Sequence, residues 1–350
     1  MPATDTLDLL CRRLGVKSLP DSMAELIEKK AEGNPFFSEE LAYGLREAGV
    51  IEIQNGECRI AAGVGNLNEL NFPATVQAVI ASRIDRLSPR EQLTLKVASA
   101  IGRSFGFQLL RDIHPIEEDK PELPNYLMKL ERFDLTPMET PEPDLRYMFK
   151  HIITQEVAYG LMLHSQRRQI HESLALWYER SYEELSGFYA ILAHHWSQTL
   201  VAEKAIFYLE KAGEQAVRSH ALREAVQFFS EALEWLASLP DTVERKEQEL
   251  RLHITLGGPL MVIKGYGAVE VKKTYDRARE LGQEVGQVSQ LFFILNGLAL
   301  SCFSQSDFSA SVEFCKQFEA LVQSTQEQRM FPIVGHSYAC NLFHLGEFNQ

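Results

Sequence analysis

The second half of the chain carries helical spacing throughout, with a repeated step from a small residue to an aromatic one. In the stretch AGEQAVRSHALREAVQFFSEALEWL, Gly213 is followed by Ala225 and then by Phe229. Ala232 comes next, and Pro240 closes the unit. Small residues let paired helices approach closely, and an aromatic side chain fills the gap between neighbouring units. Because one such unit cannot bury its own apolar face, the pattern predicts a series of stacked helix pairs.

Looser copies of this step follow. The second copy has Gly257, then Val271, Tyr275 and Ala278, and the third has Ala310 and then Phe314. The fourth has Ala339 in its first helix and Gly346 in the turn. We assign residues 181–350 to tetratricopeptide-like (TPR-like) helical repeats. The next small residue of the pattern would fall at about position 351, so we expect the last repeat to be incomplete. An unpaired final helix should expose apolar side chains around Leu342, Phe343 and Phe348.

Residues 73–180 combine helical and strand periods. A first helix begins near Val76, and the sequence SPRE at 88–91 is a capping box that opens a second helix. A third helix is expected in PELPNYLMKLERF. In DLRYMFKH the apolar residues instead recur at every second position, so Tyr147 and Phe149 are expected on the same side of a strand. Three helices followed by a hairpin predict a winged-helix domain.

Residues 1–50 contain short helices and a corner at GNP. Gly33 can take the left-handed conformation that closes a helix. Asn34 precedes a proline and is therefore pushed out of the helical region, whereas Pro35 suits the first turn of the next helix. From these residues alone, a corner between two helices without a ligand explains the pattern.

Residues 51–72 connect these two parts. The segment EIQNGECRI alternates apolar and polar residues on both sides of Asn55 and Gly56, which is a strong hairpin signal. The following AAGVGNLNELNFP is rich in glycine and asparagine and is expected to be a linker. We therefore predict a hairpin followed by a linker.

Two segments resemble a known protein family. AEGNPFFSEELAYGLREAGVI is similar to the end of the helical lid of STAND-type signalling ATPases, which share the AAA core. FPATVQAVIASRIDRLSPREQLTLKVASAIGRSF, together with FKHIITQEVAYGLM, resembles the winged-helix domain that follows the lid in members linked to class III adenylate/guanylate cyclases. The resemblance implies a mainly α chain: a lid remnant over 1–50, a winged helix over 73–180 and a TPR-like α-solenoid, cut at both ends from a longer protein.

The resemblance also implies nucleotide-binding positions. In that family the Gly-x-Pro corner lies against the adenine of the bound nucleotide, and a histidine lies beside the β-phosphate. The matching residues are Gly33, Pro35 and His151. The sequence has no phosphate-binding loop, so these residues would act only with an ATPase core outside this chain. We expect no cofactor in the chain itself and ATP or ADP in the full-length parent. From the residues alone, His151 could equally end a strand and cap the next helix.

Other chemistry is not expected. Neither His164 with His171 nor the adjacent His194 and His195 has the spacing of a metal motif, and the five cysteines are scattered without a CxxC pair. The net charge of −13 argues against a general nucleic-acid or anionic-membrane binder. We expect a cytoplasmic chain with no catalytic residues and no membrane partner.

Two functions remain open. The first is a non-catalytic regulatory segment of a signalling ATPase, which couples nucleotide state to a protein partner on the TPR-like surface, with the ATPase core in cis. The alternative is a transcriptional regulator whose winged helix binds DNA and whose repeats bind an effector. The helix expected to read DNA contains Glu122, Lys129, Glu131 and Arg132 and is close to neutral, whereas such helices carry a basic stripe. Nucleic acid is therefore not the expected partner.

Overall fold

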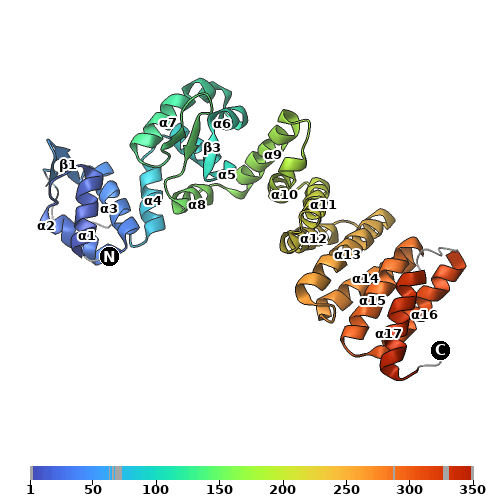
Figure 1. Cartoon of the computed structure of the whole chain (residues 1–350). Helices are drawn as coiled ribbons and strands as arrows, with labels where there is room; N and C mark the ends of the chain where they lie inside the picture. The colour runs from blue at the N-terminus through green and yellow to red at the C-terminus, as the bar shows by residue number, and fades with distance from the viewer. Residues whose placement is uncertain are drawn as a thin grey trace. The chain divides into compact units, whose positions relative to one another are not determined.

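The structure is a computed structural model that describes residues 3–62, 64, 67, 73–286, 288–325 and 331–347. The described residues are mostly helical (Figure 1), so the chain is mainly α, as predicted. They divide into two compact units, Met1–Trp177 and Tyr178–Gln350. No helix within the described residues is long and apolar enough to cross a membrane.

Residues 3–60 of the first unit form a cluster of helices with its own hydrophobic core, and we call them the N-terminal module. The elements are α1 (Ala3–Leu14), α2 (Asp21–Ala31), α3 (Pro35–Glu47), β1 (Ile51–Gln54) and β2 (Glu57–Ile60). β1 and β2 pair antiparallel, and the chain turns between them at Asn55 and Gly56, which both have positive φ. Most of the segment predicted as a linker, residues 63, 65, 66 and 68–72, lies outside the described residues.

Residues 75–177, the middle module, combine helices with a small sheet. The elements are α4 (Val76–Asp85), α5 (Pro89–Ile101), β3 (Ser104–Gly106), α6 (Phe107–Ile113), the short 3₁₀ helix η2 (Glu117–Glu122), α7 (Leu123–Arg132), β4 (Met138–Thr140), β5 (Arg146–Met148), α8 (Ile152–Gly160) and α9 (His164–Ser181). The strands form an antiparallel sheet in the order β3-β5-β4. The predicted capping box is present, because Ser88 N donates to Glu91 and Ser88 Oγ accepts from Glu91 N.

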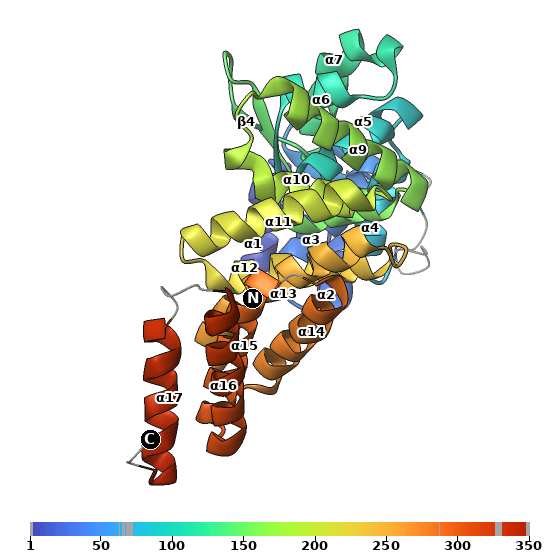
Figure 2. The same ribbon diagram turned by 90° about the vertical axis from the view of Figure 1, so that its right-hand side faces the viewer.

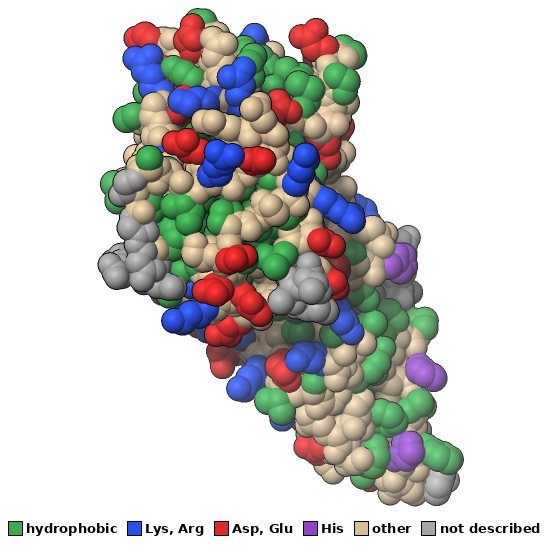
Figure 3. Space-filling model, turned by 90° about the vertical axis from the view of Figure 1, so that its left-hand side faces the viewer, with side chains coloured by type: hydrophobic (Ala, Val, Ile, Leu, Met, Phe, Trp, Pro, Cys, Tyr) green, Lys and Arg blue, Asp and Glu red, His purple; other side chains and the backbone are tan. Residues whose placement is uncertain are grey.

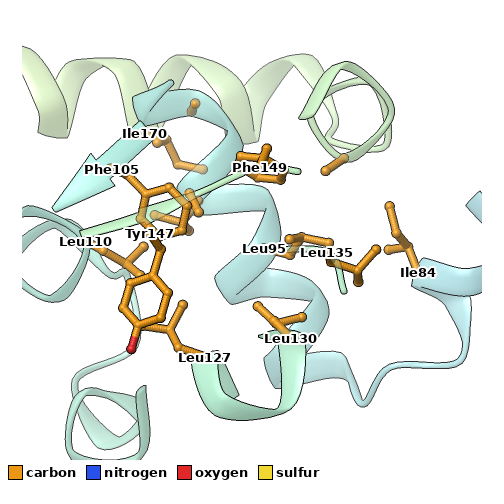
Figure 4. Close-up of a cluster of buried hydrophobic side chains, with 14 of the residues drawn as sticks. Ile84, Leu95, Phe105, Leu110, Leu127, Leu130, Leu135, Tyr147, Phe149 and Ile170 are labelled. Atoms are coloured by element: carbon orange, nitrogen blue, oxygen red, sulfur yellow. The ribbon is translucent and has the colours of Figure 1, made fainter. Parts of the chain in front are cut away.

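The core of the middle module lies between this sheet and the helices. Figure 4 shows Phe105 of β3 and Tyr147 of β5 pointing toward Leu127 of α7, with Phe149 beside Leu95 of α5. All five side chains are buried. Tyr147 and Phe149 lie on one side, as the two-residue period predicts.

The second unit consists of successive helices: the 3₁₀ helix η3 (Ser186–Phe188), α10 (Tyr189–Ser197), α11 (Ala202–Arg218), α12 (Leu222–Ala237), α13 (Val243–Lys264), α14 (Val269–Val285), α15 (Val288–Ser304), α16 (Phe308–Thr325) and α17 (Phe331–Leu345). From α10 to α17, each α-helix packs against the next one in the chain (Figures 1 and 2). This is the TPR-like solenoid that the repeat pattern predicts.

Two glycines confirm the small-to-aromatic step in the first two copies. A Cβ atom added to Gly213 would lie 2.5 Å from the ring of Phe229, and one added to Gly257 would lie 2.3 Å from the ring of Tyr275. Both aromatic side chains are buried. The glycines are therefore needed because the neighbouring helix brings an aromatic ring against their backbone.

The step assigned to Ala310 and Phe314 is only partly as predicted, because both residues are half-buried, although Phe314 packs against the hydrophobic cluster that contains Phe318. The buried face of α16 instead carries Ser311 and Phe318. Ser311 Oγ donates a hydrogen bond of 2.7 Å to the carbonyl oxygen of Ala299, which turns this face toward α15. Phe318 is the interior aromatic residue.

The last predicted copy is partly as expected. Gly346 has φ +77° and follows the end of α17, so it lies in the predicted turn. Ala339 lies in the helix but is exposed. Of the side chains expected to form an exposed apolar face, Phe343 is exposed, Leu342 is buried, and Phe348 lies outside the described residues.

Candidate functional site

The GNP corner joins α2 to α3. The left-handed conformation that ends α2 begins one residue earlier than predicted, since Glu32 has φ +49° and Gly33 has φ +78°. The Oδ1 atom of Asn34 accepts a hydrogen bond of 3.1 Å from Phe37 N, so Asn34 caps α3. Pro35 is the first residue of α3 and is exposed.

A cavity of about 350 Å³ lies beside the corner, within the N-terminal module. It is lined by side chains and backbone of α1, α2 and the corner, including Leu7, Ile27, Glu28 and Gly33. Its lining does not include Pro35, so the two corner residues named by the resemblance face different surroundings.

His151 lies where the middle module meets the corner. Its ring centroid is 4.2 Å from that of Phe36, the residue that follows Pro35. The ring is half-buried, and its Nε2 atom has no hydrogen-bond partner among the described residues. His151 occupies the N-cap position of α8, but its side chain makes no capping hydrogen bond. His151 thus caps α8 as the alternative interpretation expects, but through its backbone carbonyl, which accepts a hydrogen bond of 3.0 Å from Thr154 N.

The protonation of His151 is set by its surroundings. Burial lowers the pKa of the imidazole, and the ammonium group of Lys150 lowers it further, while Glu39 and Asp134 oppose the change. A lowered pKa keeps the ring neutral near neutral pH. Nε2 is itself buried, so the described residues leave it no open face, and a group that reached it would meet a ring without positive charge.

The two modules are joined beside His151 by a buried ion network, whose inner half is centred on Arg83 of α4. The Arg83 Nε atom lies 3.0 Å from both carboxylate oxygens of Glu47, and its Nη1 atom lies 2.6 Å from Glu40 Oε2. The guanidinium also donates to the carbonyl oxygen of Phe133. The side chain of Arg83 is 1% exposed, and both carboxylates belong to α3. This half fixes α3 against α4.

The outer half of the network is centred on Lys150, the residue before His151. The Lys150 Nζ atom lies 2.5 Å from Glu39 Oε1 and also pairs with Asp134. The Tyr43 hydroxyl lies 3.1 Å from Glu39 and 2.9 Å from Asp134, and Arg13 approaches Glu39 to 3.3 Å. This half is more open to solvent, since the side chain of Asp134 is 33% exposed and that of Arg13 is 49% exposed.

The network was not predicted, although the sequence carries a signal for part of it. The predicted apolar face of the first helix includes Val76, Ile80 and Leu87, and Arg83 falls on that same face at helical spacing. A single arginine on a buried helix face needs a buried carboxylate partner. Glu40 and Glu47, seven residues apart in the candidate helix that follows the GNP corner, were available on one face.

The surface expected to read DNA carries little free positive charge. Lys129 of α7 pairs with Glu91 at 2.7 Å, and Arg132 lies against Met128. The turn between β4 and β5 exposes Glu142 and Asp144. On the face drawn in Figure 3, basic and acidic side chains are interspersed, and the described residues there show no continuous basic stripe. Phosphate contacts need such a stripe.

Comparisons with known proteins find three similarities. Residues 3–59 match the family model described as a domain of unknown function (DUF8739). An uncharacterised protein of Rhizobium meliloti (strain 1021) is 23% identical over 349 residues, which is 95% of this chain and 31% of that protein. The crystal structure of a Signal Transduction ATPase with Numerous Domains (STAND) protein with a tetratricopeptide repeat sensor from Pyrococcus horikoshii matches with a TM-score of 0.36 and 10% identity. That match covers 100% of this chain and 52% of the archaeal chain, so this chain spans less than two thirds of either relative.

Proposed function

We propose that this chain is a non-catalytic regulatory and protein-interaction segment of a STAND-type signalling ATPase, of the kind associated with adenylate/guanylate cyclases. In this proposal the N-terminal module is the end of the ATPase lid, and the middle module is a winged helix. The TPR-like repeats carry the surface for a protein partner. The segment would relay the nucleotide state of an ATPase core in cis to that partner.

The observation that carries this proposal is the contact between the corner and His151. Phe36 and His151 belong to different modules and are far apart in the sequence, yet their rings are 4.2 Å apart. Phe36 follows Pro35 directly, and Gly33 and Pro35 are the positions that the resemblance places against adenine. A base at the corner and a phosphate at His151 Nε2 would then belong to one bound nucleotide, ATP or ADP.

The site is incomplete within this chain, so we predict no turnover by it. ATP hydrolysis and cyclic-nucleotide formation both require metal-bound phosphates and compensating charge, whereas His151 offers one neutral hydrogen bond. Purified chain 1–350 should therefore release no phosphate from ATP, form no cyclic nucleotide and show negligible nucleotide affinity by calorimetry. Steady ATP turnover that is abolished by a substitution within the chain would contradict this prediction.

In the full-length protein that the proposal implies, His151→Ala should change nucleotide retention without unfolding the protein. The substitution removes a half-buried ring and one hydrogen bond to phosphate. Nucleotide that co-purifies with the protein can be released and quantified by chromatography, with the melting temperature as the check on folding. His164→Ala is the matched control because His164 is exposed at the start of α9.

Equal nucleotide retention by wild type, His151→Ala and His164→Ala would contradict the nucleotide-sensing role. The alternative function, transcriptional regulation, predicts a different result. It requires DNA binding by the middle module that weakens steeply with salt. Such binding by chain 1–350 would favour the alternative.

A further inference from the structure

The last described helix of the solenoid carries a histidine and a cysteine that the proposed function does not use. His336 and Cys340 lie four residues apart in α17 and therefore on the same face of that helix. The Sγ atom of Cys340 lies 3.9 Å from the Nε2 atom of His336. A tetrahedral Zn²⁺ ion binds a thiolate at about 2.3 Å and an imidazole nitrogen at about 2.0 Å, which places these two ligand atoms about 3.5 Å apart. The pair therefore needs only a small adjustment to bind one ion.

Both residues line a cavity of about 110 Å³ between α15, α16 and α17. The cavity wall from α15 is apolar and includes Leu300 and Phe303. His336 is exposed, and Cys340 is half-buried with a free thiol, so an ion can reach the pair from solvent. One water molecule needs about 10–15 Å³ of such space, so the cavity has room for an ion and for water bound to it.

A buried amide in the same cavity wall lacks a hydrogen-bond partner. Asn341 is 1% exposed, and its Nδ2 atom donates a hydrogen bond of 2.7 Å to the carbonyl oxygen of Ser337. Its Oδ1 atom accepts no hydrogen bond within the part of the chain that the structure describes. A buried oxygen without a donor is unfavourable, and Asn341 lines the cavity. Water bound to an ion in the cavity is the donor that this oxygen needs.

We propose that His336 and Cys340 form a Zn²⁺-binding site, with Asn341 Oδ1 accepting a hydrogen bond from a water on the ion. Thiolate and imidazole ligands favour Zn²⁺ over hard cations such as Mg²⁺ and Ca²⁺. On binding, the Cys340 thiol releases its proton to solvent as the bond from Sγ to the ion forms, and neutral His336 supplies the lone pair of Nε2. The site lies within the repeats and is independent of the nucleotide role proposed above.

The test is a titration of reduced chain 1–350 with Co²⁺, which occupies zinc sites and absorbs in the near ultraviolet when a thiolate binds it. Wild type should develop this band, and Zn²⁺ but not Mg²⁺ should abolish it. Cys340→Ser should lose the band. His336→Ala should weaken Co²⁺ binding by at least about 10-fold, because even loss of a group that only supports a metal ligand costs about 10–100-fold. Melting temperatures check that both variants fold.

His344→Ala is the matched control. His344 is also four residues from Cys340, but its ring is stacked on that of Phe308, with the centroids 4.8 Å apart, and it is not among the residues that line the cavity. This variant should bind Co²⁺ as wild type does. Equal losses for His336→Ala and His344→Ala, no band in wild type, or a band unchanged in Cys340→Ser would overturn the proposal.

A second measurement needs no variant and decides the question if a substitution unfolds the chain. Zn²⁺ should slow the alkylation of Cys340 by iodoacetamide, followed by mass spectrometry of the peptide that contains it, because a metal-bound thiolate is a poorer nucleophile than a free one. Cys58 is the internal control, since it is a half-buried free thiol of the N-terminal module, and its alkylation should not change. Equal alkylation of Cys340 with and without Zn²⁺ would contradict the site.

Discussion

Arg83→Met should lower the free energy of unfolding of the first unit by about 3–5 kcal/mol, since it leaves Glu40 and Glu47 buried without a cation. Burial already raises the pKa of Glu40, and Arg83 opposes that rise. Removing Arg83 therefore raises the pKa further. A carboxyl group whose pKa is higher in the folded state than in the unfolded state stabilises the folded state at low pH. The difference in free energy of unfolding between wild type and Arg83→Met should therefore shrink as the pH falls from neutral.

Chemical denaturation of chain 1–350 at several pH values measures this effect. Arg86→Met is the control, because Arg86 is exposed and donates a single hydrogen bond of 2.8 Å to the Gly44 carbonyl oxygen. Arg86→Met should lower the free energy of unfolding by no more than about 1 kcal/mol, which is the usual contribution of one hydrogen bond. Equal losses for Arg83→Met and Arg86→Met at neutral pH would show that the inner half of the network is not needed for stability.

Gly257→Ala should destabilise the second unit by about 1–3 kcal/mol, whereas Gly258→Ala should change its stability by less than about 1 kcal/mol. A Cβ atom at Gly257 would lie 2.3 Å from the ring of Tyr275, which is buried and cannot move aside freely. A Cβ atom at Gly258 meets nothing within 4 Å apart from its chain neighbours, but Gly258 precedes Pro259 inside α13, where a Cβ atom is disfavoured, so the gain in helix propensity is offset.

Thermal unfolding of the two variants, followed by circular dichroism, compares adjacent positions in the same helix. The predicted result is a clearly lower melting temperature for Gly257→Ala and one close to wild type for Gly258→Ala. A Gly257→Ala variant as stable as wild type would mean that α13 and α14 do not approach as closely as the structure places them.

The repeats were predictable where the residues at the helix crossing are distinctive. Gly213 with Phe229 and Gly257 with Tyr275 have few structural explanations other than close helix packing. In α16, Ala310 and Phe314 have the right residue types, but the buried face carries Ser311, Cys315 and Phe318, with Ser311 hydrogen-bonded to the preceding helix. A small polar residue that packs in this way does not differ in sequence from an exposed one.

The site was predictable only in part. The positions of Gly33, Pro35 and His151 came from a resemblance, and no local pattern brings Phe36 against His151. β3 (SFG) carries only one apolar side chain, Phe105, and so shows no alternation, whereas the alternation around β5 continues into Leu145 and Phe149. The sheet was therefore predicted with only two strands. The ion network joins Arg83 and Lys150 to three glutamates of α3, and such long-range pairing follows from the fold and not from spacing.

The central claim is that the GNP corner and His151 hold one nucleotide in the full-length protein. Photo-crosslinking with an ADP analogue that carries a reactive azide on its base tests it most directly. The account predicts a labelled peptide that contains Gly33 and Pro35, with labelling competed by unmodified ADP and reduced in His151→Ala but not in His164→Ala. Labelling confined to peptides outside residues 28–45, or no competition by ADP, would contradict it.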